Sequence, residues 1–498
     1  MKSTAGAALT LSSMNTFAHA ETVKEPVKGM NNRKKPNVVL ICCDQLRSFS
    51  LGCYGNKSIK TPNIDKLAKE GFLFGQAVTN SPVCVPGRSN LLSGQYARTC
   101  VGSRCNEMTE NMHFGRSDRS KFPDSTLPEE FKKLGYKTSL IGKWHVDTRP
   151  SLFGFDESLI AGDIFSRASF FENEGEEFRV QGFSPDYEIS SARTFFSDNK
   201  EQPFFLYYNI IAPHMPLLDV PYKYSHMYNP DRVPLRDNVW KDGKLGVSEV
   251  WFNIYMWQTF YNAETKPITA KATPDFTVKD LTALYYGAVS WVDDIVGEVL
   301  KSLKENGLEE DTIVLFVSDH GDMLGSHHRW NKDCLYEEAI RVPMIYRWLA
   351  AVKHDTNDKQ ITSLIDVMPT LLELCGGEIP GSVQGRSMAS FLLGTAEKEC
   401  LENNYAFIET PFAELGIRTP THLYGVEMRL DKKKGIENDK HLFYDLTKDQ
   451  YQQNNLVDQN VQTELAKELR EKLIAWDENT PCLDTIDYMS WQGRYPTE

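Results

Sequence analysis

Cys84, Pro86 and Arg88 stand at alternating positions and form the most distinctive chemical pattern of this chain. Two carboxylates, Asp44 and Asp319, each follow an apolar run. Carboxylate oxygens are the ligands that hard divalent cations prefer. A cation that is fixed in place before reaction stabilises the negative charge that develops when an anionic ester is attacked. Asp44 and Asp319 are therefore candidate ligands for a divalent cation.

The apolar runs predict the sheet that must position these groups. Residues 37–43 form a short, continuous apolar segment with β-branched residues, which is typical of a buried strand in a parallel or mixed sheet. Similar runs occur at 138–142, 204–211 and 312–318, and polar or charged residues follow each of them at once. Ligand sites in open α/β sheets gather at the carboxyl ends of strands. We therefore expect the polar residues after these runs to meet.

The remaining patterns predict how the chain is divided. Residues 280–306 have apolar residues at helical spacing and predict a core helix without a catalytic role. From about Cys400, short strand-like segments precede a helix around 462–476, which favours a small α+β lobe. The predicted fold class is α/β, with a large mixed, mostly parallel sheet flanked by helices. The predicted parts are a signal peptide (1–20), a linker (21–35), a catalytic domain (36–395), and a C-terminal subdomain with a small antiparallel sheet and a helix (396–498).

Five segments in order resemble the type I, formylglycine-dependent sulfatases of the alkaline phosphatase superfamily. The most specific runs from Cys84 to Gly94, and it departs from the family pattern at Gly87, where serine is most frequent. The other matching segments are 36–47 with 51–55 and 61–65, 135–145 with 154–156, 203–216, and 318–325 with Lys332, Tyr336, Glu337 and 341–343. A closing match lies at 442–456. The resemblance implies an alkaline phosphatase-like fold.

The resemblance also implies how the reacting groups share the work. A formylglycine-generating maturation enzyme would oxidise Cys84 to Cα-formylglycine (3-oxoalanine), whose hydrated aldehyde supplies the nucleophile. Arg88 would hold that group, and Lys143 and Lys332 would bind sulfate oxygens. His145 would be the base that restores the aldehyde. His214 would help to protonate the departing alcohol, a task that suits a group titrating near neutrality. The catalytic residues implied are Cys84, Arg88, Lys143, His145, His214 and Lys332.

A divalent metal is the second implied cofactor, most commonly Ca²⁺, with Mg²⁺ or Mn²⁺ as alternatives. Its implied ligands are Asp44, Gln45, Cys84, Asp319 and His320. Familiar sulfatases tend to have Asp-Asp early and Asp-Asn late, whereas this chain has Asp-Gln and Asp-His. That pattern is closer to choline sulfatases and phosphonate monoester hydrolases. An imidazole ligand could shift the preference toward Mn²⁺ or similar ions, unless His320 only hydrogen bonds beside the metal.

Composition sets limits on partners and compartment. The net charge of −13 disfavours nonspecific binding to nucleic acid or acidic membranes. No apolar run approaches the roughly 20 residues that cross a bilayer. Residues 1–20 end in Ala18-His19-Ala20, where a signal peptidase could cut, although several polar residues also fit an unstructured N-terminus. We favour export to the periplasm or the cell exterior. Cys100 and Cys105 are close enough in sequence to pair there.

The expected activity is the removal of sulfate from a sulfated sugar or glycan. One alternative keeps the scaffold but hydrolyses a phosphonate monoester or a phosphodiester, and another is a non-catalytic glycan-binding relative. Segment 217–279 is rich in aromatic residues, which suit sugar faces but more often pack an insertion. Further candidates for substrate contact are His113, Arg116, Arg149, His327 and His328. The last two could instead belong to a loop that places Lys332.

Overall fold

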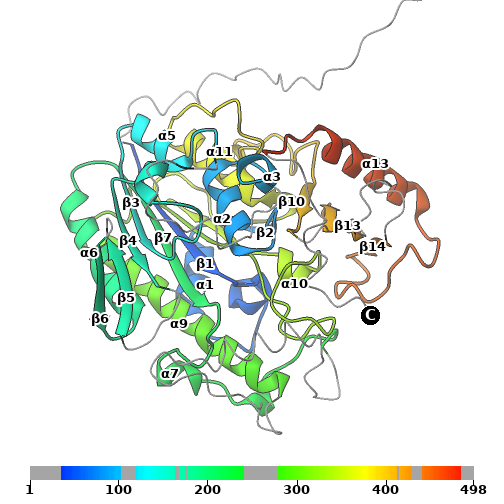
Figure 1. The fold of residues 1–498 in the computed structure, drawn as a ribbon, viewed down its shortest axis with the longest axis horizontal. Coiled ribbons are helices and arrows are strands. Elements are labelled where there is room, and N and C mark those ends of the chain that lie inside the picture. Colours follow the sequence, from blue (N-terminus) through cyan, green and yellow to red (C-terminus); the bar gives the residue numbers. More distant parts are fainter. Residues whose placement is uncertain are drawn as a thin grey trace, which may run out of the picture. The chain divides into compact units, whose positions relative to one another are not determined.

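A ten-stranded sheet forms the centre of the protein in the computed structural model (Figure 1). The structure describes residues 35–102, 119, 122–162, 168–173, 176–239, 277–411, 414–427 and 440–483. The strand order is β10-β2-β9-β8-β1-β7-β3-β4-β5-β6. The strands are β1 (Asn37–Asp44), β2 (Phe72–Val78), β3 (Lys137–Gly142), β4 (Glu157–Ala161), β5 (Ala168–Asn173), β6 (Glu176–Gln181), β7 (Phe204–Pro213), β8 (Thr312–Ser318), β9 (Met344–Arg347) and β10 (Asp355–Ser363).

The four predicted strands are β1, β3, β7 and β8, and they form the parallel centre of this sheet. β1 pairs in parallel with β7 on one side and with β8 on the other, and β7 continues in parallel to β3. Every residue of β1, β7 and β8 is buried. Antiparallel pairing occurs at β9 and in the β4-β5-β6 part. The prediction of a mixed, mostly parallel sheet is therefore confirmed.

Helices cover both faces of the sheet. The α-helices are α1 (Pro62–Glu70), α2 (Cys84–Ser93), α3 (Ala97–Cys100), α5 (Leu127–Lys133), α6 (Ser184–Asn199), α7 (Tyr222–Ser225), α9 (Val278–Glu305), α10 (Glu337–Ile340), α11 (Val367–Leu374), α12 (Ala389–Leu392) and α13 (Thr463–Asn479). The 3₁₀-helices are η1 (Ser48–Ser50), η2 (Gly52–Tyr54), η3 (Pro150–Phe153), η4 (Pro230–Arg232) and η5 (Leu364–Asp366). None of the described helices is long and apolar enough to cross a membrane.

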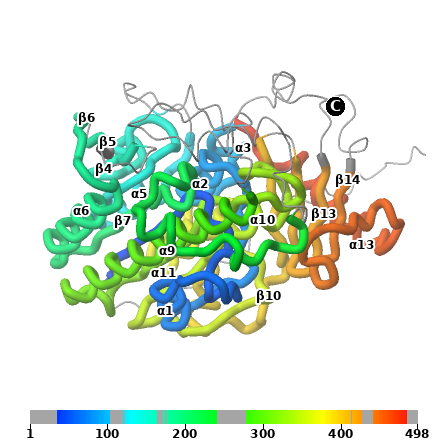
Figure 2. Tube along the Cα trace, turned by 90° about the horizontal axis from the view of Figure 1, so that it is seen from below, coloured from blue at the N-terminus to red at the C-terminus, as the bar shows by residue number. Residues whose placement is uncertain are grey.

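Side-chain alternation along β1 assigns helices to the two faces. Val39, Ile41 and Cys43 share one core cluster with the buried residues of α9, whereas Cys42 lies near Arg88 of α2. Successive side chains of a strand point to opposite faces, so α9 and α2 cover opposite sides of the sheet. α1, α6 and α7 pack against α9, and α5 and α11 pack against α2 (Figures 1 and 2). α9 begins with a capping box between Thr277 and Asp280 and is the predicted core helix.

The C-terminal segment forms a second, four-stranded antiparallel sheet, as predicted. Its strands are β11 (Ala406–Glu409), β12 (Glu414–Arg418), β13 (His422–Glu427) and β14 (Lys440–Asp445), in sequential order. Leu469 and Leu473 of α13 pack against this sheet. Arg418 holds Glu337 of α10 with two bonds, from Nε to Oε1 at 2.9 Å and from Nη2 to Oε2 at 3.0 Å. Because both side chains are buried, this pair ties the small sheet to the segment that follows Lys332.

The division of the chain at 395/396 stays a prediction. Residues 1–34 lie outside the described residues, and so does Cys105. Cys100 is buried with a free thiol. Cys42 and Cys43 are also free and fully buried, and free buried cysteines behave as small hydrophobes.

Candidate active site

The predicted metal-binding residues meet where β1 and β8 end. Asp44 is the last residue of β1, and Asp319 directly follows β8. One possible ligand atom each from Asp44, Cys84, Asp319 and His320 lies within 4.8 Å of all the others, and all four residues are buried. The parallel register that pairs Cys43 with Ser318 places the two carboxylates side by side. The two carboxylates provide oxygen donors and the imidazole provides one nitrogen donor. This set fits Ca²⁺, Mg²⁺ or Mn²⁺.

Cys84 begins helix α2 and points into this cluster. Its Sγ lies 2.8 Å from Lys332 Nζ, 3.2 Å from His320 Nε2 and 3.5 Å from Asp44 Oδ1. Burial alone would raise the pKa of the thiol, but Lys332, His320 and Lys143 hold it well below its ordinary value. The amino end of a helix also favours negative charge. The position therefore suits an anionic or strongly polarised nucleophile.

Gly87 allows helix α2 to approach the end of β8 closely. A Cβ atom at this position would lie 2.7 Å from the backbone oxygen of Asp319 and 3.2 Å from that of Ser81. Real Cβ atoms essentially never come so close to another heavy atom as the first of these distances. The departure from the family pattern at this residue thus has a structural reason in this chain.

Arg88 is completely buried between the two carboxylates. Its Nη2 lies 3.3 Å from Asp44 Oδ2, and its Nε lies 3.1 Å from Asp319 Oδ2. Nη1 donates to Asn209 Oδ1 at 2.9 Å, and Asn209 lies within β7 opposite Cys42 of β1. A planar guanidinium with several fixed donors is suited to such a bridge. Arg88 consequently ties the ends of β1 and β8 to the middle of β7 beside Cys84.

Two lysines contribute positive charge from different segments. Lys143 follows β3, and its Nζ lies 2.9 Å from Asp44 Oδ2. Lys332 comes from the loop after β8, and its Nζ contacts Gln45 Oε1 at 3.2 Å and His320 Nε2 at 3.1 Å besides Cys84. Burial and Cys84 raise the pKa of Asp44, but Lys143, His214 and Lys332 lower it below its ordinary value overall. The site therefore keeps Asp44 ionised within a dense group of cations.

The histidines differ in which ring nitrogen is free. The Nδ1 of His320 donates to the carbonyl of Gly321 at 2.9 Å, which leaves Nε2 to face Cys84. The Nδ1 of His214 lies 2.7 Å from the carbonyl of Met215, so its Nε2 is likewise left for another partner. His145 is buried with a positive φ of 46°, and it lies close enough to Cys84 to lower the pKa of the thiol.

All of the predicted catalytic and metal-binding residues therefore lie in or beside one cluster. The predicted rim residues are less uniform. His327 stacks on Tyr336 with ring centroids 3.8 Å apart, whereas His328 and Arg149 are exposed. His113 and Arg116 lie outside the described residues, as does most of the aromatic segment, from 240 to 276.

Three polar residues of the cluster received no role from the sequence. Asn209 accepts a bond from Arg88, while Asp322 and Asn331 both accept from the amide nitrogen of Gln45, at 2.5 Å and 3.1 Å. Asn209 is the one amide within the otherwise apolar run 204–211, and that interruption was the available signal. Asp322 lies within a segment that matched the family pattern.

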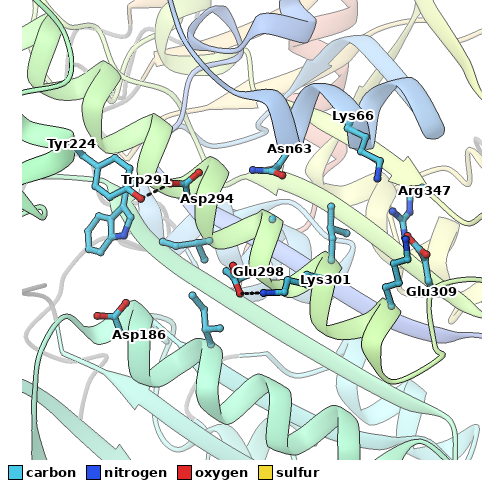
Figure 3. Close-up of a pocket in the computed structure, with 15 residues that line it drawn as sticks. Asn63, Lys66, Asp186, Tyr224, Trp291, Asp294, Glu298, Lys301, Glu309 and Arg347 are labelled. Carbon is cyan, nitrogen blue, oxygen red and sulfur yellow. Dashed lines mark hydrogen bonds and ion pairs between the residues drawn. The ribbon is translucent and has the colours of Figure 1, made fainter.

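A separate surface hollow lies between α1, α6 and α9 (Figure 3). Its lining contains none of the predicted site residues. Two cations of the lining pair with acidic groups of the same lining, Lys301 with Glu298 at 3.7 Å and Arg347 with Glu309 at 3.5 Å. This balanced lining does not single out an anionic substrate.

Comparison with known families agrees with this geometry. Residues 36–377 match the family model described as sulfatase. The chain belongs to the sulfatase family. Residues 325–479 also match the C-terminal model of N-sulphoglucosamine sulphohydrolase. Sulfatase membership makes the chain a hydrolase of the alkaline phosphatase superfamily, and it implies a formylglycine and a metal, which the buried Asp, Cys, Asp and His group could hold.

Several relatives of this sulfatase-family chain are curated sulfatases. An ulvan-active sulfatase of Formosa agariphila is 29% identical and covers 95% of this chain and 88% of its own length. An arylsulfatase of Clostridium perfringens is 30% identical, with coverage of 88% and 94%. An N-acetylglucosamine-6-O-sulfatase of Bacteroides thetaiotaomicron is 25% identical, with coverage of 88% and 86%.

Solved structures share the fold. A protein in complex with its substrate D-glucosamine-2-N,6-O-disulfate matches with a TM-score of 0.74 at 22% identity, over 91% of this chain and 100% of that one. A phosphonate monoester hydrolase of Agrobacterium radiobacter matches with a TM-score of 0.67 at 21% identity, over 90% and 96%.

Proposed function

We propose that this chain removes sulfate from a sulfated sugar or glycan. The reaction would use a formylglycine that is made from Cys84, together with a divalent cation, for which Ca²⁺ is the first choice. The observation that carries the proposal is the position of Cys84. Its Sγ lies 2.8 Å from Lys332 Nζ, 3.2 Å from His320 Nε2 and 3.5 Å from Asp44 Oδ1. A formylglycine hydrate at this position would supply a nucleophilic oxygen, and a cation held by Asp44, Gln45, Asp319 and His320 would supply positive charge for the ester oxygens.

The residues of this chain divide the remaining work. Lys143 and Lys332 approach Cys84 from different segments, and they are suited to bind the anionic oxygens of a sulfate ester. Arg88 fixes the nucleophile helix against both carboxylates. His145, next to Cys84, would accept a proton from the nucleophile position. His214 keeps Nδ1 on a backbone carbonyl, and its Nε2 would donate a proton to the leaving alcohol.

The relatives support the proposal that the substrate is a sulfated sugar. The ulvan-active and N-acetylglucosamine-6-O-sulfatases are named for sulfated saccharides, and each covers most of this chain.

The sequence of segment 1–20 supports export of the protein, which would bring it to polysaccharides outside the cell. Sequencing the N-terminus of the mature protein tests export, and a start at Glu21 is expected.

The decisive experiment is sulfate release from a panel of sulfated saccharides and aryl sulfates, after co-expression with a formylglycine-generating enzyme. Turnover is expected for the native chain and not for Cys84→Ala. Cys53→Ala, which changes a thiol outside the site, is the matched control. Absence of turnover in the native chain, or unchanged turnover in Cys84→Ala, would refute the proposal. Mass spectrometry of the Cys84 peptide should show a mass about 18 Da lower after conversion. Its consistent absence would favour a non-catalytic glycan-binding role.

A phosphonate monoester or phosphodiester hydrolase is the second candidate. It is favoured by the Asp-Gln and Asp-His pairs at positions 44–45 and 319–320. Comparing kcat/KM for matched sulfate and phosphonate monoesters separates the two functions, because this ratio reports differential binding of the transition states. If kcat/KM is higher for the phosphonate than for the matched sulfate ester, the substrate is a phosphonate ester and not a sulfate ester.

A further inference from the structure

We propose that Asp322 is a positioning residue that determines which atom of the Gln45 side chain faces the reacting groups. The inference rests on the proposed function, since the orientation of this amide matters when an anion and a cation share the site. Asp322 lies three residues after Asp319 and is 1% exposed. The cation ligands proposed above include Gln45 but not Asp322.

The hydrogen bonds of Gln45 fix its amide in one orientation. Nε2 donates to Asp322 Oδ2 at 2.5 Å and to Asn331 Oδ1 at 3.1 Å. Oε1 lies on the other side and accepts from Lys332 Nζ at 3.2 Å. The ammonium of Lys332 can only donate, so the amide atom that faces it must be the oxygen, and the nitrogen is left to face Asp322. Gln45 therefore presents its oxygen to Lys332 and the cluster.

The opposite orientation would place a donor where an acceptor is needed. With the amide turned over, Nε2 would face the ammonium of Lys332, and Oε1 would face the carboxylate of Asp322. Both contacts are repulsive, and all of these groups except Lys332 are buried. Unpaired polar groups are costly in such surroundings. Asp322 thus selects the orientation that gives the site an oxygen.

Asp322 uses both of its carboxylate oxygens. Oδ1 accepts from the backbone nitrogen of Leu324 at 2.7 Å, while Oδ2 accepts from Gln45. Leu324 has a positive φ of 42°, so the first bond stabilises a turn that a leucine seldom adopts. An asparagine at 322 could accept only one of these two bonds, because its second atom is a donor. If its oxygen keeps the turn at Leu324, its Nδ2 faces Gln45 and forces that amide to turn over.

The test measures binding of Ca²⁺ and Mn²⁺ by calorimetry on the full chain matured with the formylglycine-generating enzyme, together with kcat, KM and Tm. Asp322→Asn should lower metal affinity about 10- to 100-fold, the range typical for residues that orient metal ligands. Asp293→Asn is the matched control. Asp293 is likewise 1% exposed and accepts two backbone N–H groups, from Asn63 and Ile64, away from the site. It should lower Tm without changing metal affinity.

A reciprocal exchange provides the rescue. In Gln45→Glu combined with Asp322→Asn, the asparagine Nδ2 would donate to a glutamate oxygen, and the other glutamate oxygen would face Lys332. The net charge of the pair is unchanged, and the turn at Leu324 keeps its acceptor. On a logarithmic scale, the double variant should recover at least half of the metal affinity that Asp322→Asn loses. A merely structural defect would not show this recovery.

The outcomes are distinct. If Asp322→Asn lowers Tm but binds both metals like the native chain, the positioning role is wrong. It is equally wrong if the double variant binds no better than Asp322→Asn. If the native chain binds metal, and the variants behave as expected, but no sulfate ester is hydrolysed, the proposed function fails while the positioning role stands.

Discussion

The Nζ of Lys332 lies 2.8 Å from the Sγ of Cys84, although 248 residues separate them in the chain. The contact joins the start of α2 to the loop after β8, and the same ammonium group reaches Gln45 and His320. A fixed cation at this distance from the nucleophile atom will lie next to any anionic ester that the nucleophile attacks. Removal of the Lys332 side chain should therefore lower the catalytic rate and leave the stability of the fold nearly unchanged.

Lys332→Ala is expected to lower kcat for a sulfate ester about 10²–10³-fold, the loss typical when one preorganised charge-stabilising donor is removed. Tm should change little, because Lys332 is only partly buried. Steady-state kinetics and thermal unfolding of the matured protein provide the check. Lys353→Ala, at an exposed lysine, is the control. A Lys332→Ala protein with native kcat would contradict the assigned role.

Arg88→Met should destabilise the fold in addition to abolishing activity. The guanidinium is fully buried between Asp44 and Asp319, and its loss leaves two buried carboxylates without their shared partner. Breaking a buried ion pair in this way typically costs about 3–5 kcal/mol. Urea unfolding at neutral pH measures the loss, and added Ca²⁺ should restore part of it by binding the folded state. An unchanged unfolding free energy would show that the carboxylates find another partner.

The sequence was sufficient to predict the centre of the fold. Fully buried parallel strands are continuous apolar runs, so β1 and β8 could be recognised, and Asp44 and Asp319 stand where such runs end. The edge of the sheet was harder, because the residues of β6 are exposed or only partly buried along the whole strand. Its pairing with β5 depends on a partner strand more than on its own pattern.

The hydrogen-bond network around the site could not be predicted in the same way. Family resemblance located Gln45, but the orientation of its amide depends on Asp322, which lies 277 residues away. Similarly, the bond between Arg88 and Asn209 requires the parallel register that places Asn209 of β7 opposite Cys42 of β1. Contacts of this kind arise from tertiary packing, and no local spacing encodes them.

Serine is the most frequent residue at the position of Gly87 in related motifs. Gly87→Ser is nevertheless expected to reduce activity in this chain. The added Cβ would lie 2.7 Å from the backbone oxygen of Asp319, so α2 and the end of β8 must separate. Misplacement of a catalytic group by about 1 Å can cost on the order of 100-fold in rate. Kinetics of the matured variant measure this, with conversion of Cys84 verified by mass spectrometry. Gly381→Ser, where a Cβ meets nothing within 4 Å, is the control.

Glu188→Gln should stabilise the protein increasingly as the pH rises. Glu188 is fully enclosed by the fold, and this burial raises the pKa of its carboxyl to about 8, against 4.5 ordinarily, despite the nearby hydroxyls of Tyr208 and Ser184. Below pH 4.5 both states are protonated, so the carboxyl carries no penalty. Between pH 4.5 and about 8 the unfolded chain releases the proton while the folded chain retains it, which progressively favours unfolding. The glutamine variant avoids this loss, on the order of 3–5 kcal/mol when complete. Urea unfolding at pH 5 and pH 8.5 should show the larger gain at pH 8.5, and an equal gain at both would contradict a buried, neutral carboxyl.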